Sequence, residues 1–293
     1  MNKIESSERI AIKLVISIVL FNPDLLILEQ VLDSVKFAFD DSKRKWDVSC
    51  IIDLVDNNPN GGYSELVSQL IDIRNTHKFT LRLIKSPRNG GYGFGNNLSI
   101  SAHKDCDFHL VLNPDILLSK TALSDAFNFL LDNPCIGLLT PMVRGWNGEL
   151  HYLCKHSPTL LDMLIRSNLL PFLKDVFKNK VLRYEMRDRD YSKVITPVPY
   201  PTGCFMLFRK KILNLIGGFD EGYFLHYEDA DIGKKVSLIS STAYVPDVVV
   251  THKWSRDTHK SWEMRWITIK SGLRYWWKWN VSRPGIVRNS NSI

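Results

Sequence analysis

The feature that most restricts the fold is a nearly continuous apolar run close to the start of the chain, KLVISIVLF at 13–21. It is rich in β-branched residues, as expected for a strand buried on both faces of a parallel sheet. Asn22-Pro23-Asp24 follows, and apolar residues then recur at helical spacing from Leu25 to Phe39. Asn22 is expected to cap this helix and Pro23 to occupy its first turn.

The same order of strand and helix repeats over roughly the first 115 residues. Further strands are expected at 48–58, 80–86 and 108–115, and helices at 63–74 and near 96–104. Such alternation predicts βαβ units and an α/β fold with a Rossmann-like, mostly parallel central sheet flanked by helices.

Polar clusters follow three of the expected strands, NPD at 22–24, DNNPNGG at 56–62 and NPD at 113–115. Ligands of parallel sheets bind beyond the carboxyl ends of the strands. The repetition therefore predicts one ligand-binding rim.

The second half of the chain has a different pattern. Residues 160–183 are amphipathic and basic, and VITPVPYPTG at 194–203 is rich in proline, so 150–200 is expected to be a variable insertion. A strand is expected to resume at 203–208. We expect one domain over 1–255, divided into two halves (1–118 and 119–255), followed by a helical extension over 256–293.

The basic charge is concentrated at the C-terminal end. The formal net charge is +7, and the residues from His252 onward hold nine Lys or Arg against two acids (9 − 2 = +7). This region includes RYWWKWN at 274–280. Aromatic and basic residues together favour a membrane interface with anionic lipid, while ordinary packing of a last helix and a nucleic-acid surface are the alternatives. Because anionic lipid or a diphosphate ligand explains the charge as well as DNA does, no nucleic-acid partner is expected.

Other features indicate a cytoplasmic protein. The run LVISIVLF is too short to span a bilayer, and the first ten residues lack the order of a signal peptide. Five scattered Cys form no CxxC pair, which suits reduced thiols better than disulfides or a zinc site.

Three short motifs in the first half could carry chemistry. Asp56 could accept the imide N–H of a uracil or thymine, or it could simply cap a turn. RNGGYGFGNN at 88–97 lets the backbone approach a phosphate or sugar, or it forms a plain loop; it completes neither a dinucleotide fingerprint nor a P-loop. Asp115, just past a buried strand, could bind Mg²⁺ or Mn²⁺ on a diphosphate, or cap a helix.

The stretch FDEGYFLHYEDADIG at 219–233 places five carboxylates among aromatic rings. Acids this close repel one another unless water, a cation or hydrogen bonds separate them. Glu228 and Asp231 are expected to crowd Asp229 and raise its pKa, unless Asp231 points away on a helix. The neighbouring rings stack on sugar faces or pack in the core.

The order of these motifs resembles the family 2 glycosyltransferases with the GT-A fold, especially the rhamnosyltransferase-like enzymes that assemble bacterial O-antigen and other surface polysaccharides. The motifs in question are strand-DNN, NGGxG, LNPD, GGFDExxFxxxEDxD and a later His, and the resemblance covers roughly 13–255. It implies an inverting transfer of a sugar from a nucleotide donor, dTDP-rhamnose or a UDP-sugar, to a lipid-linked saccharide at the inner membrane surface.

The resemblance also implies a role for individual residues. Asp229 would be the catalytic base, and Mg²⁺ or Mn²⁺ would be held by Asp115 and His252. The donor-binding residues would be Asn22, Asp56, Asn89, Gly90, Gly91, Asn96, Asn113 and Asp115. The acceptor-side residues would be Asp220, Glu221, Tyr227 and Glu228, with His226 as a variant contact.

Two departures from the family pattern affect these expectations. Asn113-Pro114-Asp115 replaces the usual Asp-x-Asp, which implies modest metal affinity and favours an L-rhamnose donor. LFNPD at 20–24 replaces the usual Thr-Tyr-Asn and leaves the ribose contact open. A UDP-hexose transferase, a nucleotidyltransferase and a catalytically silent carbohydrate- or nucleotide-binding protein are the alternatives. A nucleotidyltransferase would need a basic, glycine-rich loop directly after the first strand, and this sequence has none there. A catalytically silent protein would be expected to have lost Asp115 or Asp229, and both are present.

Overall fold

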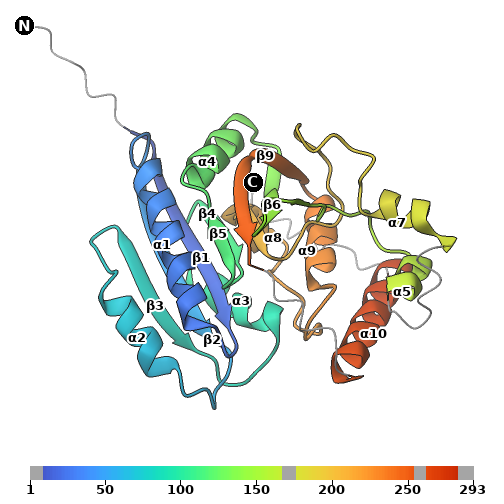
Figure 1. Ribbon diagram of the computed structural model, residues 1–293, viewed down its shortest axis with the longest axis horizontal. Helices are drawn as coiled ribbons and strands as arrows, with labels where there is room; N and C mark the ends of the chain where they lie inside the picture. The colour runs from blue at the N-terminus through green and yellow to red at the C-terminus, as the bar shows by residue number, and fades with distance from the viewer. Residues whose placement is uncertain (1–8, 167–175, 254–261, 283–293) are drawn as a thin grey trace, which may run out of the picture.

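The computed structural model describes residues 9–166, 176–253 and 262–282, and it has an α/β architecture around a nine-stranded sheet (Figure 1). The spatial order of the strands is β3-β2-β1-β4-β8-β6-β9-β5, with β7 paired to β6. The strands are β1 (Ala11–Leu20), β2 (Asp47–Asp56), β3 (Phe79–Lys85), β4 (Phe108–Leu112), β5 (Ile116–Leu118), β6 (Ile136–Gly145), β7 (Leu150–His151), β8 (Phe205–Arg209) and β9 (Ser241–His252).

The helices of the described residues lie on both faces of this sheet and at its C-terminal side. They are α1 (Leu25–Ser42), α2 (Ser64–Asp72), α3 (Tyr92–Ala102), α4 (Ala122–Asp132), α5 (Leu160–Arg166), α7 (Lys178–Tyr184), α8 (Lys210–Leu215), α9 (Glu228–Ser237), α10 (Trp262–Trp276) and the π-helical η2 (Trp277–Ser282). None of them has the length and apolar content that a membrane crossing requires.

The sheet is mostly parallel, as the alternation of strands and helices predicts. Strands β3, β2, β1 and β4 run parallel, and β6 runs parallel to β9. Only β8, β5 and β7 pair antiparallel to their neighbours. Leu20 pairs with Asp56 and Asp56 with Lys85, so the carboxyl ends of β1, β2 and β3 lie level along one edge of the sheet.

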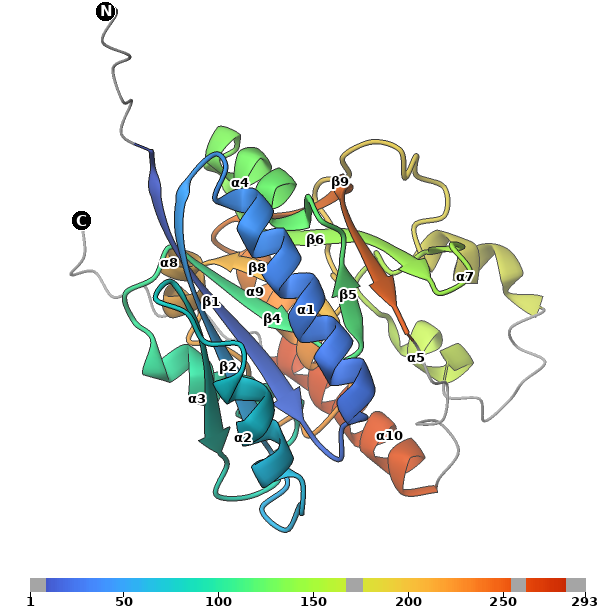
Figure 2. The ribbon, with the colours of Figure 1, turned by 60° about the vertical axis from the view of Figure 1, so that its left-hand side comes forward.

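Two apolar cores lie on opposite faces of the sheet. The larger core packs α1, α2 and α4 against one face and includes Ile16, Val31 and Phe127. The smaller core packs α3, α8 and α9 against the other face and includes Val111 and Ile232. Figure 2 shows α1 and α2 in front of the sheet and α9 behind it. Because most of β1 is buried between these layers, its sequence is apolar and β-branched rather than alternating.

Two helix starts differ from the sequence expectation. Asp24, and not Asn22, caps α1, because its Oδ1 accepts the backbone N–H groups of Leu26 and Ile27 (3.0 and 3.2 Å). Helix α3 begins at Tyr92, four residues before the expected start, inside the glycine-rich motif. Gly93 and Gly95 are helical, and Phe219 and Val19 occupy the space that their side chains would need.

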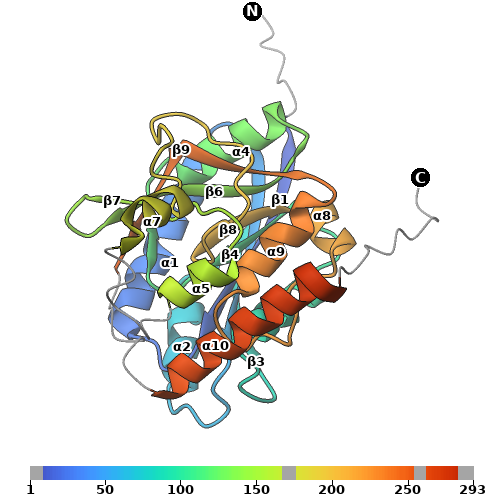
Figure 3. The same cartoon turned by 90° about the vertical axis from the view of Figure 1, so that its right-hand side faces the viewer.

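The C-terminal helix α10 lies across the end of the molecule beside α5 and α9 (Figure 3). A cluster of buried tyrosines, including Tyr223, Tyr227 and Tyr275, joins it to the rest of the fold, and Met163 of α5 packs against this cluster. Within the range of the expected extension, residues 262–282 form α10 and η2. The other residues of 256–293, and 167–175 of the amphipathic segment, lie outside the described residues.

Candidate active site

The expected rim exists at the carboxyl ends of β1 and β2. Asn22 follows β1, and its Oδ1 accepts a hydrogen bond from Asn58 Nδ2 (2.8 Å) in the loop after β2. Asn57 Nδ2 donates to Asn89 Oδ1 (3.1 Å) and to the Gly91 carbonyl (3.0 Å). Since β1 lies between β2 and β4, this edge is the topological switch point at which open α/β sheets bind ligands.

Asp56 is nearly buried at the last position of β2, and hydrogen bonds fix its carboxylate. The hydroxyls of Tyr63 and Ser64 donate to its two oxygens (both 2.6 Å), and the Asn58 N–H donates to Oδ1 (3.0 Å). Burial and the contact with Asp56 raise the pKa of Tyr63 well above its ordinary value, so the phenol remains a donor. A carboxylate oxygen can accept more than one hydrogen bond, so Asp56 can still accept a base N–H.

The glycine-rich turn touches the acidic stretch that is far away in sequence. Gly91 has φ of 90°, and a Cβ there would lie 2.0 Å from the Phe224 carbonyl oxygen. The next backbone N–H, that of Tyr92, donates to the same oxygen (3.0 Å). Gly90 is also buried, against Phe94. Only glycine permits this approach of two backbones, so the NGG motif packs directly against the acidic stretch.

Asn96, an expected donor contact, is fully buried inside the protein. Its Oδ1 accepts from the Ser17 hydroxyl (2.6 Å), and its Nδ2 donates to the Tyr92 carbonyl (3.0 Å). His109, also buried, lies 3.2 Å from the same hydroxyl. Asn96 therefore links α3 to β1 within the core, because both its amide oxygen and its amide nitrogen are hydrogen-bonded there.

The segment after β4 contains the residues expected to hold a divalent metal. Asp115 Oδ2 lies 3.2 Å from His252 Nε2 at the end of β9, because Ile116 pairs with His252 in the β5–β9 ladder. Asp115 Oδ1 and Asn113 Oδ1 are buried and have no hydrogen-bond partner within the described part of the chain. Carboxylate and amide oxygens are ligands that suit Mn²⁺ or Mg²⁺. The residues therefore fit the metal, although the described residues contain no cluster of three His, Cys, Asp or Glu side chains.

Asp229 lies in the first turn of α9, facing the segment before β8. The Gly203 N–H donates to its Oδ2 (3.2 Å), and the Ala230 N–H donates to its Oδ1 (2.9 Å). The Asn113 N–H donates to the Cys204 carbonyl (2.9 Å), which brings the metal segment beside the same loop. Asp229 is half-buried, so its carboxylate is held by these N–H groups and is still partly exposed.

Glu228, beside Asp229, is buried, and its Oε2 has no hydrogen-bond partner among the described residues. Burial, together with the nearby Asp229 charge, raises its pKa to about 8. The sequence predicts crowding of Asp229, and the structure shows that Glu228 is the group whose pKa the crowding raises. At neutral pH Glu228 is therefore largely protonated.

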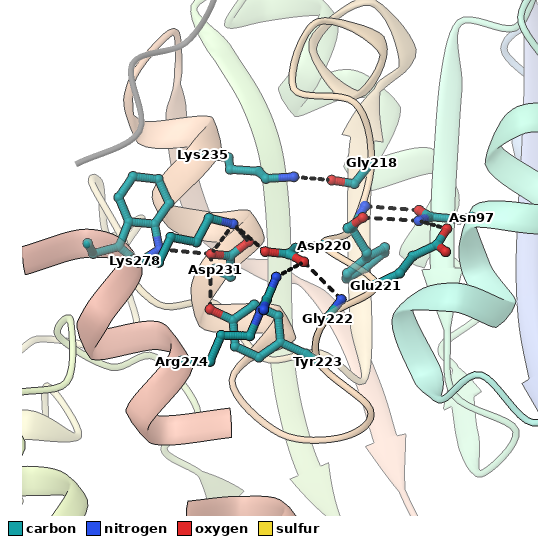
Figure 4. A network of polar contacts seen from close by, with 12 residues as sticks. Asn97, Gly218, Asp220, Glu221, Gly222, Tyr223, Asp231, Lys235, Arg274 and Lys278 are labelled. Atoms are coloured by element: carbon teal, nitrogen blue, oxygen red, sulfur yellow. Dashed lines mark hydrogen bonds and ion pairs between the residues drawn. The ribbon is translucent and has the colours of Figure 1, made fainter. Parts of the chain in front are cut away.

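The other acids of the stretch are bound by protein groups (Figure 4). Glu221 accepts from Asn97 Nδ2 (2.9 Å), and Asp220 accepts from Gly222 N–H, Arg274 and Lys278. Asp231 is fully buried and points away from Asp229 toward the C-terminal helix, where it meets Lys278 and Trp279. Tyr227 is buried with a left-handed backbone (φ 66°). The rings of this stretch mainly pack in the core.

Several residues of the site are absent from the sequence-based expectations. Asn57, Tyr92 and Gly203 all contact expected site residues, and the Tyr92 hydroxyl donates to the Gly203 carbonyl (2.7 Å). The sequence signals for two of them are the TG dipeptide at 202–203 and the DNN tripeptide at 56–58. Burial raises the pKa of the Cys204 thiol to about 12, so this cysteine is a poor nucleophile at neutral pH.

Sequence comparison finds relatives among rhamnosyltransferases. The chain is 29% identical over 214 residues to rhamnosyltransferase WbbL of Escherichia coli, a match that covers 69% of this chain and 75% of the relative. It is 25% identical over 189 residues to N-acetylglucosaminyl-diphospho-decaprenol L-rhamnosyltransferase of Mycobacterium tuberculosis, covering 61% of this chain and 60% of that relative. No protein-family model matches the chain.

Structure comparison identifies the fold. The mannosyltransferase PcManGT from Pyrobaculum calidifontis, solved with GDP-Man and Mn²⁺, superposes with a TM-score of 0.59 at 16% identity, covering 89% of this chain and 64% of the other. Its identity is too low to indicate more than the fold. By its fold and its sequence similarity, this chain is a glycosyltransferase with the GT-A fold, similar to the rhamnosyltransferases of family 2.

Proposed function

We propose that this protein is an inverting glycosyltransferase that moves a sugar from a pyrimidine nucleotide donor to a hydroxyl of a lipid-linked glycan. The observation that carries the proposal is the position of Asp229, held by the Gly203 N–H beside the segment that contains Asn113 and Asp115. A carboxylate there can take the proton of an acceptor hydroxyl. The hydroxyl oxygen then bonds to the anomeric carbon as the bond from that carbon to the diphosphate breaks.

The rim residues give the donor a defined orientation. Asp56, fixed by Tyr63 and Ser64, would accept the imide N–H of the base, and the polar groups of Asn22 and Asn89 would face the ribose and diphosphate. Asp115, Asn113 and His252 would hold the divalent cation. Bound there, the cation would neutralise charge on the departing diphosphate.

The candidate donor is dTDP-L-rhamnose, and the candidate acceptor is a saccharide linked to a lipid diphosphate. The names of both sequence relatives support rhamnose, and the mycobacterial name supports a lipid-linked acceptor. The Asn-Pro-Asp form of the metal segment supports the same donor. A UDP-hexose is the competing donor, because the GT-A fold also serves other nucleotide sugars, such as the GDP-Man of PcManGT.

A donor screen tests this proposal. Purified protein is mixed with dTDP-rhamnose, UDP-hexoses and GDP-mannose, with Mn²⁺, Mg²⁺ or EDTA, and binding is measured by thermal shift while nucleotide release is measured with a lipid-linked acceptor. We expect dTDP-rhamnose to bind and react, and EDTA to suppress the reaction. Asp115→Asn should weaken the response to metal, whereas the exposed Asp132→Asn on α4 should not. A response to UDP-hexose alone would replace the rhamnose assignment, and binding of no nucleotide sugar would contradict the proposal.

We also propose that the protein works at the cytoplasmic face of the inner membrane. One surface, here named the α10 aromatic face, is formed by exposed residues at helical spacing, namely Trp262, Trp266 and Leu273 of α10 and Trp277 of η2. Their exposed fractions are 73%, 60%, 55% and 59% in that order. Arg265 stacks on Trp262 (5.5 Å to the ring centroid) and adds positive charge. Exposed leucines of α5, namely Leu160, Leu161 and Leu164, add apolar surface. Aromatic and basic residues together favour an anionic interface.

Vesicle sedimentation tests the membrane proposal. The protein should sediment with vesicles that contain phosphatidylglycerol and less with pure phosphatidylcholine. Trp266→Glu should reduce binding, while Phe37→Glu, an equally exposed apolar position on α1, should not. Equal binding by Trp266→Glu and the unsubstituted protein would rule out the α10 aromatic face.

A further inference from the structure

Two carboxylates of the acidic stretch, Asp220 and Asp231, face the C-terminal helix instead of the reaction centre. Asp231 is fully buried in α9, and Lys278 Nζ lies 2.8 Å from its carboxylate. The indole N–H of Trp279 donates to Oδ1 (2.8 Å), and the Tyr223 hydroxyl lies 3.4 Å from the same atom. A buried carboxylate requires such partners, so Asp231 depends on residues of η2.

Lys278 joins Asp231 to the loop that precedes α9. Its Nζ also donates to Asp220 Oδ2 (2.7 Å), and Arg274 Nη2 donates to Asp220 Oδ1 (2.8 Å). Burial alone would raise the pKa of Asp220, but hydrogen bonds from Lys278, the Gly222 N–H and Arg274 outweigh it and lower this pKa to about 2. Figure 4 shows the resulting C-terminal ion-pair cluster, which comprises Asp220, Asp231, Arg274 and Lys278.

Helix α10 also contacts the loop between these two acids. The Ser271 hydroxyl donates to the Leu225 carbonyl (2.9 Å), and the ring of Tyr275 lies 6.0 Å from that of Tyr227. His226 and Tyr227 both have positive φ (68° and 66°), a conformation that persists only when surrounding contacts hold it.

Asp229 comes two residues after this strained pair and two before Asp231. Side chains two apart on a helix point in different directions, so Asp231 can be bound by Lys278 while Asp229 faces Gly203. We propose that Asp231 and Lys278 are positioning residues: the C-terminal segment, through the ion-pair cluster, sets the start of α9 and therefore the placement of Asp229. This inference rests on the proposed role of Asp229.

The test compares Lys278→Ala, Lys278→Arg and Asp231→Asn in the full chain, with Lys234→Ala as the control. Lys234 is a cation on α9 for which the structure describes no side-chain partner. Hydrogen exchange of the backbone amides at 223–231 is measured first, because it needs no enzymatic activity. Lys278→Ala and Asp231→Asn should speed exchange there, while Lys278→Arg and Lys234→Ala should not.

Kinetics with the donor found by the screen provide the second measurement. For Lys278→Ala we expect kcat to fall by about 10- to 100-fold, the range that a misplaced catalytic group produces, with donor affinity within about twofold of the unsubstituted protein. Lys278→Arg should restore most of kcat. The double variant Lys278→Ala with Asp231→Asn should lose less than the product of the single losses, because both act through one contact.

Three results would overturn the inference. They are unchanged exchange at 223–231 in Lys278→Ala, unchanged kcat despite faster exchange, and a parallel loss of donor affinity and kcat, which would indicate general destabilisation. If the unsubstituted protein transfers no sugar, the proposed function fails separately, and the exchange measurement alone decides whether the cluster orders the loop.

Discussion

Neighbouring carboxylates in this protein have different surroundings. Glu228 is buried without a hydrogen-bond partner for its Oε2 among the described residues, Asp229 accepts two backbone N–H groups, and Asp231 is paired with Lys278. All three occur within four consecutive residues. The sequence shows that these acids are close together, but only the fold shows which faces solvent, which faces apolar groups and which faces a cation.

Glu228 gives the stability a distinctive pH dependence. Its pKa is raised from 4.5 to about 8 in the folded state, so its protonated form is favoured by folding. The associated stability is fully present below pH 4.5 and is lost as the pH rises through 8. We expect Glu228→Gln to be less sensitive than the unsubstituted protein to a change from about pH 6 to about pH 9, as measured by Tm.

The matched comparison for this measurement is Glu149→Gln, an exposed acid in the turn between β6 and β7. It should keep the pH dependence of the unsubstituted protein. If Glu228→Gln shows the same fall in Tm with rising pH as the unsubstituted protein, Glu228 is not protonated in the folded state.

The sequence predicts the bounds of some strands and helices more closely than those of others. Strands β1 and β2 are close to their expected bounds because long, largely buried runs rich in β-branched residues are a local signal. The start of α3 could not be predicted, since Gly93 and Gly95 normally disfavour helix and are tolerated here because Phe219 and Val19 pack against them. Phe219 is more than 120 residues from Gly93 in the sequence, so no local pattern contains this contact.

Gly91, at the start of α3, should be intolerant of substitution. Gly91→Ala would place a Cβ 2.0 Å from the Phe224 carbonyl oxygen at a positive φ, so we expect a loss of about 1–3 kcal/mol in the free energy of unfolding and a lower transfer rate. Gly62→Ala is the control, because a Cβ there meets nothing within 4 Å. Denaturant unfolding of both variants checks this, and similar stabilities would contradict the close approach.

At the scale of the whole molecule, the order of the motifs predicts the fold and the general position of the site. It predicts the individual contacts less well. The GT-A architecture and the similarity to rhamnosyltransferases are confirmed. Asp115 lies beside His252, and their binding of a metal stays a prediction. The sequence alone leaves two alternatives for the basic, Trp-rich segment: packing of a last helix against the fold, or a membrane surface. Arg274, Lys278 and Trp279 pack on the acidic stretch, while Trp262, Trp266 and Trp277 are exposed. Which residues of this segment pack and which are exposed depends on the side of the helix that contacts the rest of the fold. That side is set by residues distant in sequence.

The central claim is that Asp229 removes the proton of the acceptor hydroxyl. The most direct measurement is the rate of sugar transfer from dTDP-rhamnose to a lipid-linked acceptor by the unsubstituted protein and by Asp229→Asn, with donor binding measured in parallel. A positioned base contributes about 10²- to 10⁴-fold, so we predict a loss of that size with donor affinity nearly unchanged. A variant that transfers sugar at close to the original rate while binding the donor normally would contradict the assignment of Asp229 as the base.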